Sequence, residues 1–416
     1  MLRQIEGSWA VAHSVALCRP EVICAYPITP QTHIVEALGV LVKRGELAPC
    51  EFVNVESEFA AMSVAIGASA TGARSYTATA SQGLLYMTEA VYNAAGLGLP
   101  IVMTVANRAI GAPINIWNDQ SDSMALRDAG WVQLYARDNQ EAADLHIQAF
   151  RLAEELSQPV MVCMDGFILT HAFEPVDVPD QELVDAYLPP YEPRQVLDVA
   201  NPVSIGAMVG PEAFTEVRYL ADHRLYQALD RIPAHQAAFS EIFGRDSGGL
   251  LRPHGLDGAE TVAVALGSVL GTIDVVVDQL RARGVPIGSL GITTFRPFPA
   301  AAVRAALAGA KRVVVIEKAF APGAGGIVSG DVKLALGASA DVHTVVAGLG
   351  GRPITAASLR GLFETAVAGE LEPMKFLDLQ TKLVDRELGR VAAGRRSGPS
   401  AENILQDLAT ALGPLD

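Results

Sequence analysis

The sequence predicts an α/β protein in which a doubly wound, mostly parallel β-sheet is followed by a second, smaller α/β domain. Short apolar runs alternate along the chain with segments whose hydrophobic residues recur at helical spacing. These runs are rich in valine, alanine and glycine, which is typical of strands covered on both faces. With 416 residues, 50% of them hydrophobic, the chain is long enough for about two or three domains.

Composition and charge exclude several classes of function. Acidic residues outnumber basic ones by 46 to 31, and the net charge of −15 argues against nucleic acid or an anionic membrane as a partner. We find no apolar run long enough for a membrane span and no signal-peptide pattern at the N-terminus, so we expect a soluble, cytoplasmic protein. The 4 cysteines and 8 histidines show no metal-ligand spacing, so we expect free thiols and assign no metal to this chain.

The first predicted domain covers residues 1–250. A buried helix over 7–17 precedes predicted strands at 22–25, 51–55, 75–79, 101–105 and 159–164. Predicted helices lie at 34–42, 58–70, 84–96 and 140–156. Residues 174–202 are rich in proline and acidic side chains with little periodicity, so we interpret them as a surface crossing without packed elements. A helix over roughly 211–232 is expected to cap the domain.

The second predicted domain covers residues 255–375. Its predicted strands are 260–266, 287–292, 312–316 and 343–346, and its predicted helices are 272–283, 300–308 and 327–336. Residues 293–299 are interpreted as a rigid loop. Gly325 and Gly326 precede a helix, where they form either an anion cradle or, as we favour, a tight turn. The charged extension 376–416, which includes Arg395 and Arg396, is expected to contact a partner subunit.

The stretch from Tyr26 to Thr32 is the first candidate for a binding site. Pro27 and Pro30 end the preceding strand and restrict the backbone on both sides of Thr29. Thr29 is therefore predicted to lie on a turn at the carboxyl end of a parallel strand, where open α/β sheets bind ligands. The alternative is a proline-rich turn that binds nothing.

Charged side chains also follow other predicted strands. Glu58 stands at a helix start, where a carboxylate is often only a favourable partner of the helix dipole. Arg108 comes just after a buried strand and is either a binder of a carboxylate or phosphate or one half of a structural salt bridge. The polar loop 111–122, which carries Trp117, is either a binding loop or the capped start of a helix.

Five sequence blocks occur in a fixed order and together carry a resemblance to a known family. They are Tyr26-Pro27-Ile28-Thr29-Pro30, Val55-Glu56-Ser57-Glu58, Ala80-Ser81-Gln82-Gly83-Leu84, Asn107-Arg108-Ala109 with Ile114-Asn115-Ile116-Trp117-Asn118-Asp119, and Asp165-Gly166-Phe167 with Thr170-His171. In this order the chain resembles, nearly end to end, the α subunit of the 2-oxoacid:ferredoxin oxidoreductases of the pyruvate:ferredoxin oxidoreductase type.

The resemblance implies a fold and a set of site residues. The first domain would be the thiamine diphosphate-binding domain of the pyrimidine type, and the second would be a transketolase C-terminal-like domain. Glu58 would hydrogen-bond the aminopyrimidine ring of the cofactor, Arg108 would bind the substrate carboxylate, and Thr29 would donate to a substrate oxygen. The other implied cofactor contacts are Tyr26, Pro27, Ile28, Ser81, Gln82 and Gly83, and the other implied substrate contacts are Asn115 and Trp117.

Two features that the implied enzyme needs are missing from the sequence. We find no Gly-Asp-Gly loop followed by asparagines for the diphosphate and its Mg²⁺, since Gly330-Asp331-Val332 lacks the third glycine. We also find no cysteine cluster for an iron–sulfur centre. The resemblance implies that a β subunit supplies the diphosphate loop, with Mg²⁺ and [4Fe–4S] clusters on partner chains, so that this chain alone is expected to be inactive.

The implied activity is the oxidative decarboxylation of a 2-oxoacid to an acyl-coenzyme A and carbon dioxide. Electrons would pass to partner subunits of the ferredoxin-like and γ types, or through an additional flavin subunit to NAD. The sequence leaves open whether the 2-oxoacid is pyruvate, a branched-chain acid or an aryl acid such as phenylglyoxylate, and whether the acceptor is ferredoxin or NAD. One alternative is a non-catalytic assembly scaffold with a degenerate thiamine fold, which the intact Thr29, Glu58 and Arg108 disfavour. The other is a transketolase-like or synthase-like carboligase, which the absence of the diphosphate loop and the order of the blocks disfavour.

Overall fold

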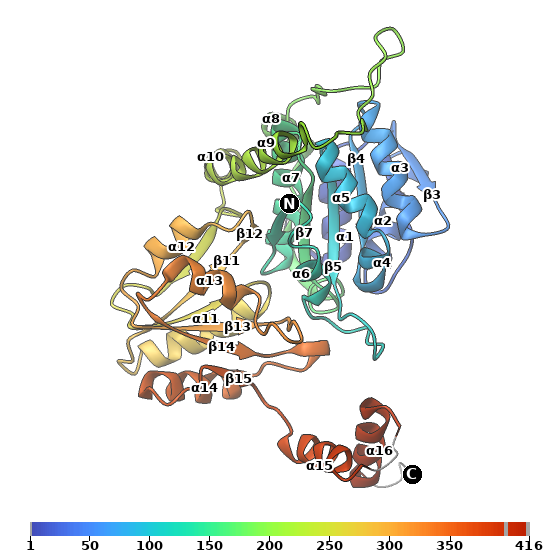
Figure 1. The fold of residues 1–416 in the computed structure, drawn as a ribbon. Helices are drawn as coiled ribbons and strands as arrows, with labels where there is room; N and C mark the ends of the chain where they lie inside the picture. The colour runs from blue at the N-terminus through green and yellow to red at the C-terminus, as the bar shows by residue number, and fades with distance from the viewer. Residues whose placement is uncertain (1, 395–397, 413–416) are drawn as a thin grey trace.

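The computed structural model describes residues 2–394 and 398–412 and contains two large β-sheets, each with helices on both faces (Figure 1). A helical hairpin near the C-terminus stands apart from both sheets (Figure 1). This arrangement confirms the predicted α/β class, with its doubly wound parallel sheet followed by a second α/β layer.

The first sheet has 7 strands in the order β12-β6-β7-β5-β4-β2-β3, and all pairs are parallel except that of the edge strand β12. The strands are β2 (Val22–Ala25), β3 (Glu51–Asn54), β4 (Ser75–Thr79), β5 (Ile101–Asn107), β6 (Val132–Tyr135), β7 (Val160–Asp165) and β12 (Thr294–Arg296). Every residue of the central strand β5 is buried, because helices cover both of its faces. This burial explains the continuous apolar run in the sequence.

Helices cover the two faces of the first sheet in separate groups. One group is α1 (Gly7–Leu17), α2 (Thr32–Lys43) and α7 (Asn139–Leu156), and the other is α3 (Glu58–Ala70), α4 (Ser81–Tyr86) and α5 (Thr88–Leu97). Helix α3 begins where it does because the Ser57 hydroxyl accepts a hydrogen bond from the Ala60 N–H at 3.2 Å. This cap places Glu58 as the first residue of the helix, directly after β3.

Two segments that we interpreted as loops contain strands. Residues 174–202 include most of β8 (Phe173–Asp177), which pairs with β1 (Leu2–Glu6), and the helix α8 (Gln181–Tyr187). Residues 293–299 include β12, which pairs with β6 of the first sheet. In both cases the partner strand is distant in the sequence, and edge strands of this kind carry little local periodicity.

The predicted capping helix at 211–232 is in fact two helices. They are α9 (Phe214–Tyr226) and α10 (Ala228–Phe243). Only α10 has buried residues, among them Ile232 and Phe239, and it packs against α7. The short helix α6 (Ser121–Ala125) agrees with the alternative of a helix start at the end of the loop 111–122, whereas strand β6 was not predicted as an element.

The second sheet has 6 strands in the order β15-β14-β13-β10-β11-β9, with only β9 antiparallel. The strands are β9 (Leu251–His254), β10 (Thr261–Ala265), β11 (Ile287–Ile292), β13 (Arg312–Glu317), β14 (Asp341–Val346) and β15 (Met374–Phe376). The helices are α11 (Val269–Arg281), α12 (Ala300–Ala306), α13 (Val328–Leu336) and α14 (Ala356–Ala368). Strands β9 and β15 are short edge strands that the sequence pattern did not indicate.

The two sheets share one hydrophobic core. A single cluster of buried side chains runs from Met62 and Trp131 beside the first sheet to Val264 and Val315 in the second. A buried ion pair also joins them, since Lys318 Nζ lies 2.8 Å from Asp165 Oδ2 and both side chains are at most 3% exposed. The carboxyl ends of β7 and β13 are therefore held together.

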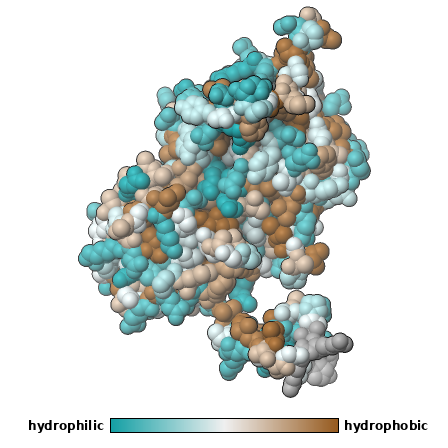
Figure 2. Space-filling view, in the orientation of Figure 1, coloured by the Kyte–Doolittle hydropathy of each residue, from teal (hydrophilic) through white to brown (hydrophobic). Residues whose placement is uncertain are grey.

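The C-terminal hairpin consists of α15 (Thr381–Ala392) and α16 (Ser400–Leu412). Hydrophobic side chains gather on its surface (Figure 2), and Leu388, Val391 and Leu405 are each at least 60% exposed. Arg395 and Arg396 of the predicted extension lie outside the described residues. Among the described helices, none has the length and apolar content needed to cross a bilayer.

Candidate active site

The three residues with implied catalytic roles lie at one edge of the first sheet. Thr29 follows β2, Glu58 follows β3, and Arg108 follows β5. Because β2, β3, β4 and β5 are parallel neighbours, their carboxyl ends meet at the same edge. This is the edge at which open α/β sheets bind ligands.

Glu58 is a nearly buried carboxylate with no hydrogen-bond or ion-pair partner in the described part of the chain; its exposed fraction is 8%. Its side chain packs against Gly83 in the first turn of α4, where a Cβ atom would lie 2.7 Å from Glu58 Oε1. The absence of a side chain at residue 83 therefore leaves room for the carboxylate at this edge of the sheet.

Arg108 is buried without a carboxylate beside its guanidinium. It donates from Nη1 to the Thr29 carbonyl at 2.9 Å and from Nε to the Asn115 carbonyl at 3.0 Å, and it is 6% exposed. Burial lowers the pKa of Arg108, and the nearby Asp122 carboxylate opposes this effect. No salt bridge of Arg108 is found among the described residues, so the alternative of a structural ion pair is not supported.

Asp122 is a site residue that we did not predict. Its fully buried carboxylate accepts hydrogen bonds from the backbone N–H groups of Ser81 and Arg108, each at 2.9 Å, and from the Asn107 amide at 2.8 Å. Burial raises the pKa of Asp122 to about 7, although these hydrogen bonds favour the carboxylate form. Asp122 therefore joins the two turns that carry Ser81 and Arg108.

Gln31 is a second unpredicted residue, and it holds the turn that carries Thr29. Its buried side chain donates to the Ala78 carbonyl at 2.7 Å and accepts from the Ile28 N–H at 3.2 Å. The turn is thus tied to the end of β4, while Tyr26, Pro27 and Thr29 remain exposed. In the sequence, Gln31 was marked only by its position directly after the proline-rich turn.

Ser81 and Gln82 line the start of α4 beside this site. Ser81 has a φ of +50° and its hydroxyl donates to the Ala109 carbonyl at 2.5 Å. The hydroxyl also contacts the Gln82 side chain, whose amide lies against Gly111. The two predicted cofactor contacts are therefore packed against the segment that follows Arg108.

Asn115 and Trp117 lie on a loop that contacts the second sheet. The Asn115 amide donates to the Gly350 carbonyl at 3.2 Å, and the Gly350 N–H donates to Asp119 Oδ2 at 3.1 Å. Gly350 belongs to a one-turn 3₁₀ helix, Leu349–Gly351. Trp117 is 52% exposed and its ring lies 4.7 Å from that of Phe167. The structure thus brings this predicted binding loop together with both sheets.

The predicted turn at Gly325 and Gly326 is not open to an external anion. The N–H groups of Val328 and Ser329 at the start of α13 donate to the buried Glu317 carboxylate, at 3.2 Å and 2.7 Å. An internal carboxylate therefore occupies the position at which an anion would bind.

Comparison with known proteins shows which family this chain is similar to. Residues 13–236 match the family model described as pyruvate flavodoxin/ferredoxin oxidoreductase, thiamine diphosphate-binding, and residues 259–359 match the pyruvate:ferredoxin oxidoreductase core domain II. The chain is 48% identical over 390 residues to the pyruvate synthase subunit PorA of Methanosarcina barkeri, covering 91% of this chain and 97% of that protein.

One further relative and one solved structure are also similar to this chain. The chain is 40% identical over 364 residues to the ketoisovalerate oxidoreductase subunit VorA of Pyrococcus abyssi, covering 86% of this chain and 92% of that protein. Its fold is similar to that of the 2-oxoglutarate:ferredoxin oxidoreductase from Magnetococcus marinus, with a TM-score of 0.68 and 20% identity, covering 88% of this chain and 65% of that one.

The fold and the matched models define a subunit that combines a thiamine diphosphate-binding α/β domain with a second α/β domain. The chain belongs to the pyruvate flavodoxin/ferredoxin oxidoreductase family, as an α subunit of the 2-oxoacid:ferredoxin oxidoreductases.

Proposed function

We propose that this chain supplies the pyrimidine-binding half of a thiamine diphosphate site that it shares with a β subunit. The unpartnered, nearly buried Glu58 carboxylate carries this proposal, because such a carboxylate needs a hydrogen-bond donor that the described part of the chain does not provide. The missing side chain at Gly83 leaves room for that carboxylate at the edge of the sheet. Mg²⁺ and [4Fe–4S] clusters would be held by partner chains.

The proposed reaction converts a 2-oxoacid and coenzyme A into an acyl-coenzyme A and carbon dioxide, with release of two electrons and one proton. Bound thiamine diphosphate would supply the carbon nucleophile and the electron sink. Glu58 would hold a proton-bearing ring nitrogen of the cofactor, and Arg108 would bind and orient the substrate carboxylate. The exposed Thr29 side chain would donate to a substrate oxygen.

The substrate we propose is a short 2-oxoacid, with pyruvate as the first candidate. Relatives named as pyruvate synthase subunits support this choice, as does 48% identity over nearly the whole chain to one of them. A branched-chain acid is the second candidate, because the ketoisovalerate oxidoreductase subunit is 40% identical. Phenylglyoxylate and an NAD-linked acceptor belong in the same assay panel as further candidates.

We also propose that the helical hairpin α15–α16 contacts a partner subunit. Its exposed Leu388, Val391 and Leu405 are the side chains that a partner would cover. The non-catalytic scaffold remains the alternative function. The Glu58 carboxylate without a partner and the Arg108 guanidinium without a salt bridge among the described residues disfavour it, because a scaffold gains nothing from burying such charges.

The test begins with anaerobic capture of the chain together with its partners from its own host. Thiamine diphosphate released by acid and iron are quantified, and a one-electron dye reports turnover that depends on both coenzyme A and a 2-oxoacid. We expect cofactor, iron and turnover in the complex and no turnover by the chain alone. A stable complex without cofactor would favour the scaffold.

The matched variants are Glu58→Gln and Glu56→Gln, which lie two residues apart on the same segment. Glu58→Gln should abolish turnover while size-exclusion chromatography still shows the complete complex. Glu56→Gln changes an exposed carboxylate and should leave the rate unchanged. An unaffected rate in Glu58→Gln would remove this residue from the mechanism.

A further inference from the structure

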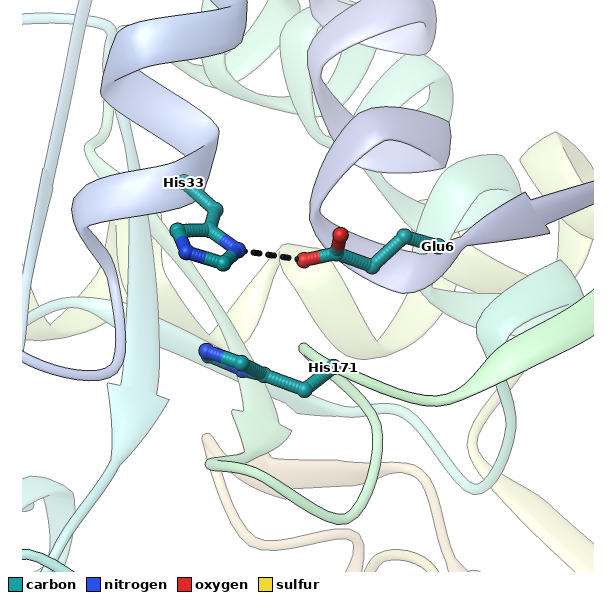
Figure 3. A group of neighbouring side chains, drawn as sticks. All are labelled: Glu6, His33 and His171. Atoms are coloured by element: carbon teal, nitrogen blue, oxygen red, sulfur yellow. Dashed lines mark hydrogen bonds and ion pairs between the residues drawn. The ribbon is translucent and has the colours of Figure 1, made fainter.

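Two histidines and a glutamate from three separate segments meet beside the candidate active site (Figure 3). Glu6 ends β1, His33 is the second residue of α2, and His171 lies in the turn between β7 and β8. One potential ligand atom from each side chain lies within 4.8 Å of the other two. Two imidazoles and one carboxylate form a donor set that divalent transition metals prefer.

Backbone hydrogen bonds hold two of these residues in fixed positions. Glu6 pairs with Phe173 in the register of β1 and β8, and the Gly7 N–H donates to the Ala172 carbonyl at 3.0 Å. The Ser8 N–H donates to the Thr170 carbonyl at 2.9 Å. Glu6 and His171 are therefore kept close by the pairing of segments that are distant in the sequence.

The contacts around the imidazoles leave nitrogen atoms free for a metal. The Nδ1 atom of His171 lies 2.7 Å from the hydroxyl of the buried Thr170, which also accepts from the Phe167 N–H at 2.8 Å. This contact fixes the ring and directs Nε2 of His171 away from Thr170. His33 Nδ1 lies 2.6 Å from Glu6 Oε1. A small rotation of either side chain would move these two atoms apart, so that both could bind the same ion.

The two imidazole rings lie against one another and the cluster is reachable from solvent. Their centroids are 4.5 Å apart, and the His33 side chain is 44% exposed while that of Glu6 is 13% exposed. Two protonated imidazoles at this distance would repel each other, whereas two neutral ones bind a cation together.

We propose that Glu6, His33 and His171 form a binding site for one divalent transition-metal ion such as Zn²⁺, with the remaining coordination positions open to water. None of its three residues is among those proposed to contact thiamine diphosphate. It lies at the end of a row of rings, Trp117, Phe167, His171 and His33, whose successive centroids are 4.7, 4.7 and 4.5 Å apart. Metal binding would therefore fix the start of α2 against the turn that supports Trp117.

The experiment uses the purified full chain, stripped of metal by a chelator and titrated with Co²⁺ and with Zn²⁺. Visible absorption of Co²⁺ and isothermal titration of Zn²⁺ should both report about one equivalent per chain. His33→Gln and His171→Gln should each weaken binding by about tenfold or more. Zn²⁺ should raise the melting temperature of the original chain and not that of either variant.

The control variant is His254→Gln. His254 forms a comparable surface pair with Asp278, with His254 Nε2 2.7 Å from Asp278 Oδ1, but it is not part of a three-ligand group. The His254→Gln substitution should leave metal binding unchanged. Absence of binding, or equal affinity in all of these variants, would overturn the proposal and leave a Glu6–His33 ion pair. Since no readout depends on turnover, the outcome is independent of the proposed function.

Discussion

The backbone N–H of Arg108 donates to Asp122 Oδ2 at 2.9 Å, and the same oxygen accepts from the Ser81 N–H at 2.9 Å. One buried carboxylate thus positions the proposed substrate-binding arginine and the proposed cofactor-binding turn together. No other carboxylate among the described residues accepts a hydrogen bond from the backbone N–H of Ser81 or Arg108. The position of Arg108 relative to the sheet edge therefore depends on Asp122.

Replacing this carboxylate should disturb both turns. In Asp122→Asn, a nitrogen donor would take the place of one carboxylate oxygen and face backbone N–H donors. A buried N–H group that loses its hydrogen-bond acceptor in this way costs about 1–3 kcal/mol. We expect a lower melting temperature, a lower kcat and a higher KM for the 2-oxoacid in the assembled complex. Asp128→Asn, at a side chain that is 68% exposed, is the control and should change none of these values.

Arg108→Leu should chiefly raise the KM for the 2-oxoacid. The variant removes the guanidinium fork and its charge, and a hydrogen bond to a charged group is worth about 1.5–3 kcal/mol, or at least about a tenfold change. Steady-state kinetics of the complex give the measurement, with Arg44→Leu at an exposed position as the control. A structural role for Arg108 would instead give an unchanged KM with a less stable chain.

Gly83→Ala tests whether the space beside Glu58 is needed. The added Cβ would lie 2.7 Å from Glu58 Oε1 and 2.7 Å from Thr79 Oγ1, so the carboxylate must move. We expect reduced binding of thiamine diphosphate and a lower kcat in a complex that still assembles. Gly67→Ala in α3, where the new methyl group meets nothing within 4 Å, is the matched control. Equal activity of the two variants would show that the glycine at residue 83 is not required.

The sequence predicted the elements whose signals are local. The buried strands of the first sheet other than β6, and the helices that follow them, were visible as apolar runs and helical periodicity. The residues after these strands included the candidates Thr29, Glu58 and Arg108. Strands β8 and β12 were missed because each is defined by a partner far along the chain. Their own residues are few and their sequences do not alternate in a recognisable way.

The site residues that were missed have the same explanation. Asp122 was part of a polar loop, and its burial and three of its four hydrogen bonds depend on residues at the ends of two other strands. Glu6, His33 and His171 show no ligand spacing, because folding alone brings them together. Local sequence patterns do not indicate contacts between residues that are distant in the sequence.

The ion pair between Lys318 and Asp165 should make a large contribution to stability at neutral pH. Breaking a buried pair by removing one partner costs about 3–5 kcal/mol, since the other charge stays buried. Lys318→Met should therefore lower the free energy of unfolding by about that amount. Lys311→Met is the control, because its pair with Glu260 is exposed and is worth about 1 kcal/mol or less.

The pH dependence of this difference follows from Asp165. Burial raises the pKa of Asp165, but the charge of Lys318 and the hydrogen bonds from Lys318 and Ser268 outweigh burial and hold the pKa below its ordinary value. The group therefore stabilises the fold above its unfolded pKa of about 3.9, and this contribution is lost as pH falls through the lower, folded pKa.

Without Lys318, burial should raise the pKa of Asp165, and the variant should lose stability as pH rises above about 4. The difference in unfolding free energy between the original chain and Lys318→Met should thus be larger at pH 7 than near pH 4. Urea unfolding at both values measures it, and a difference that does not change with pH would contradict the buried ion pair.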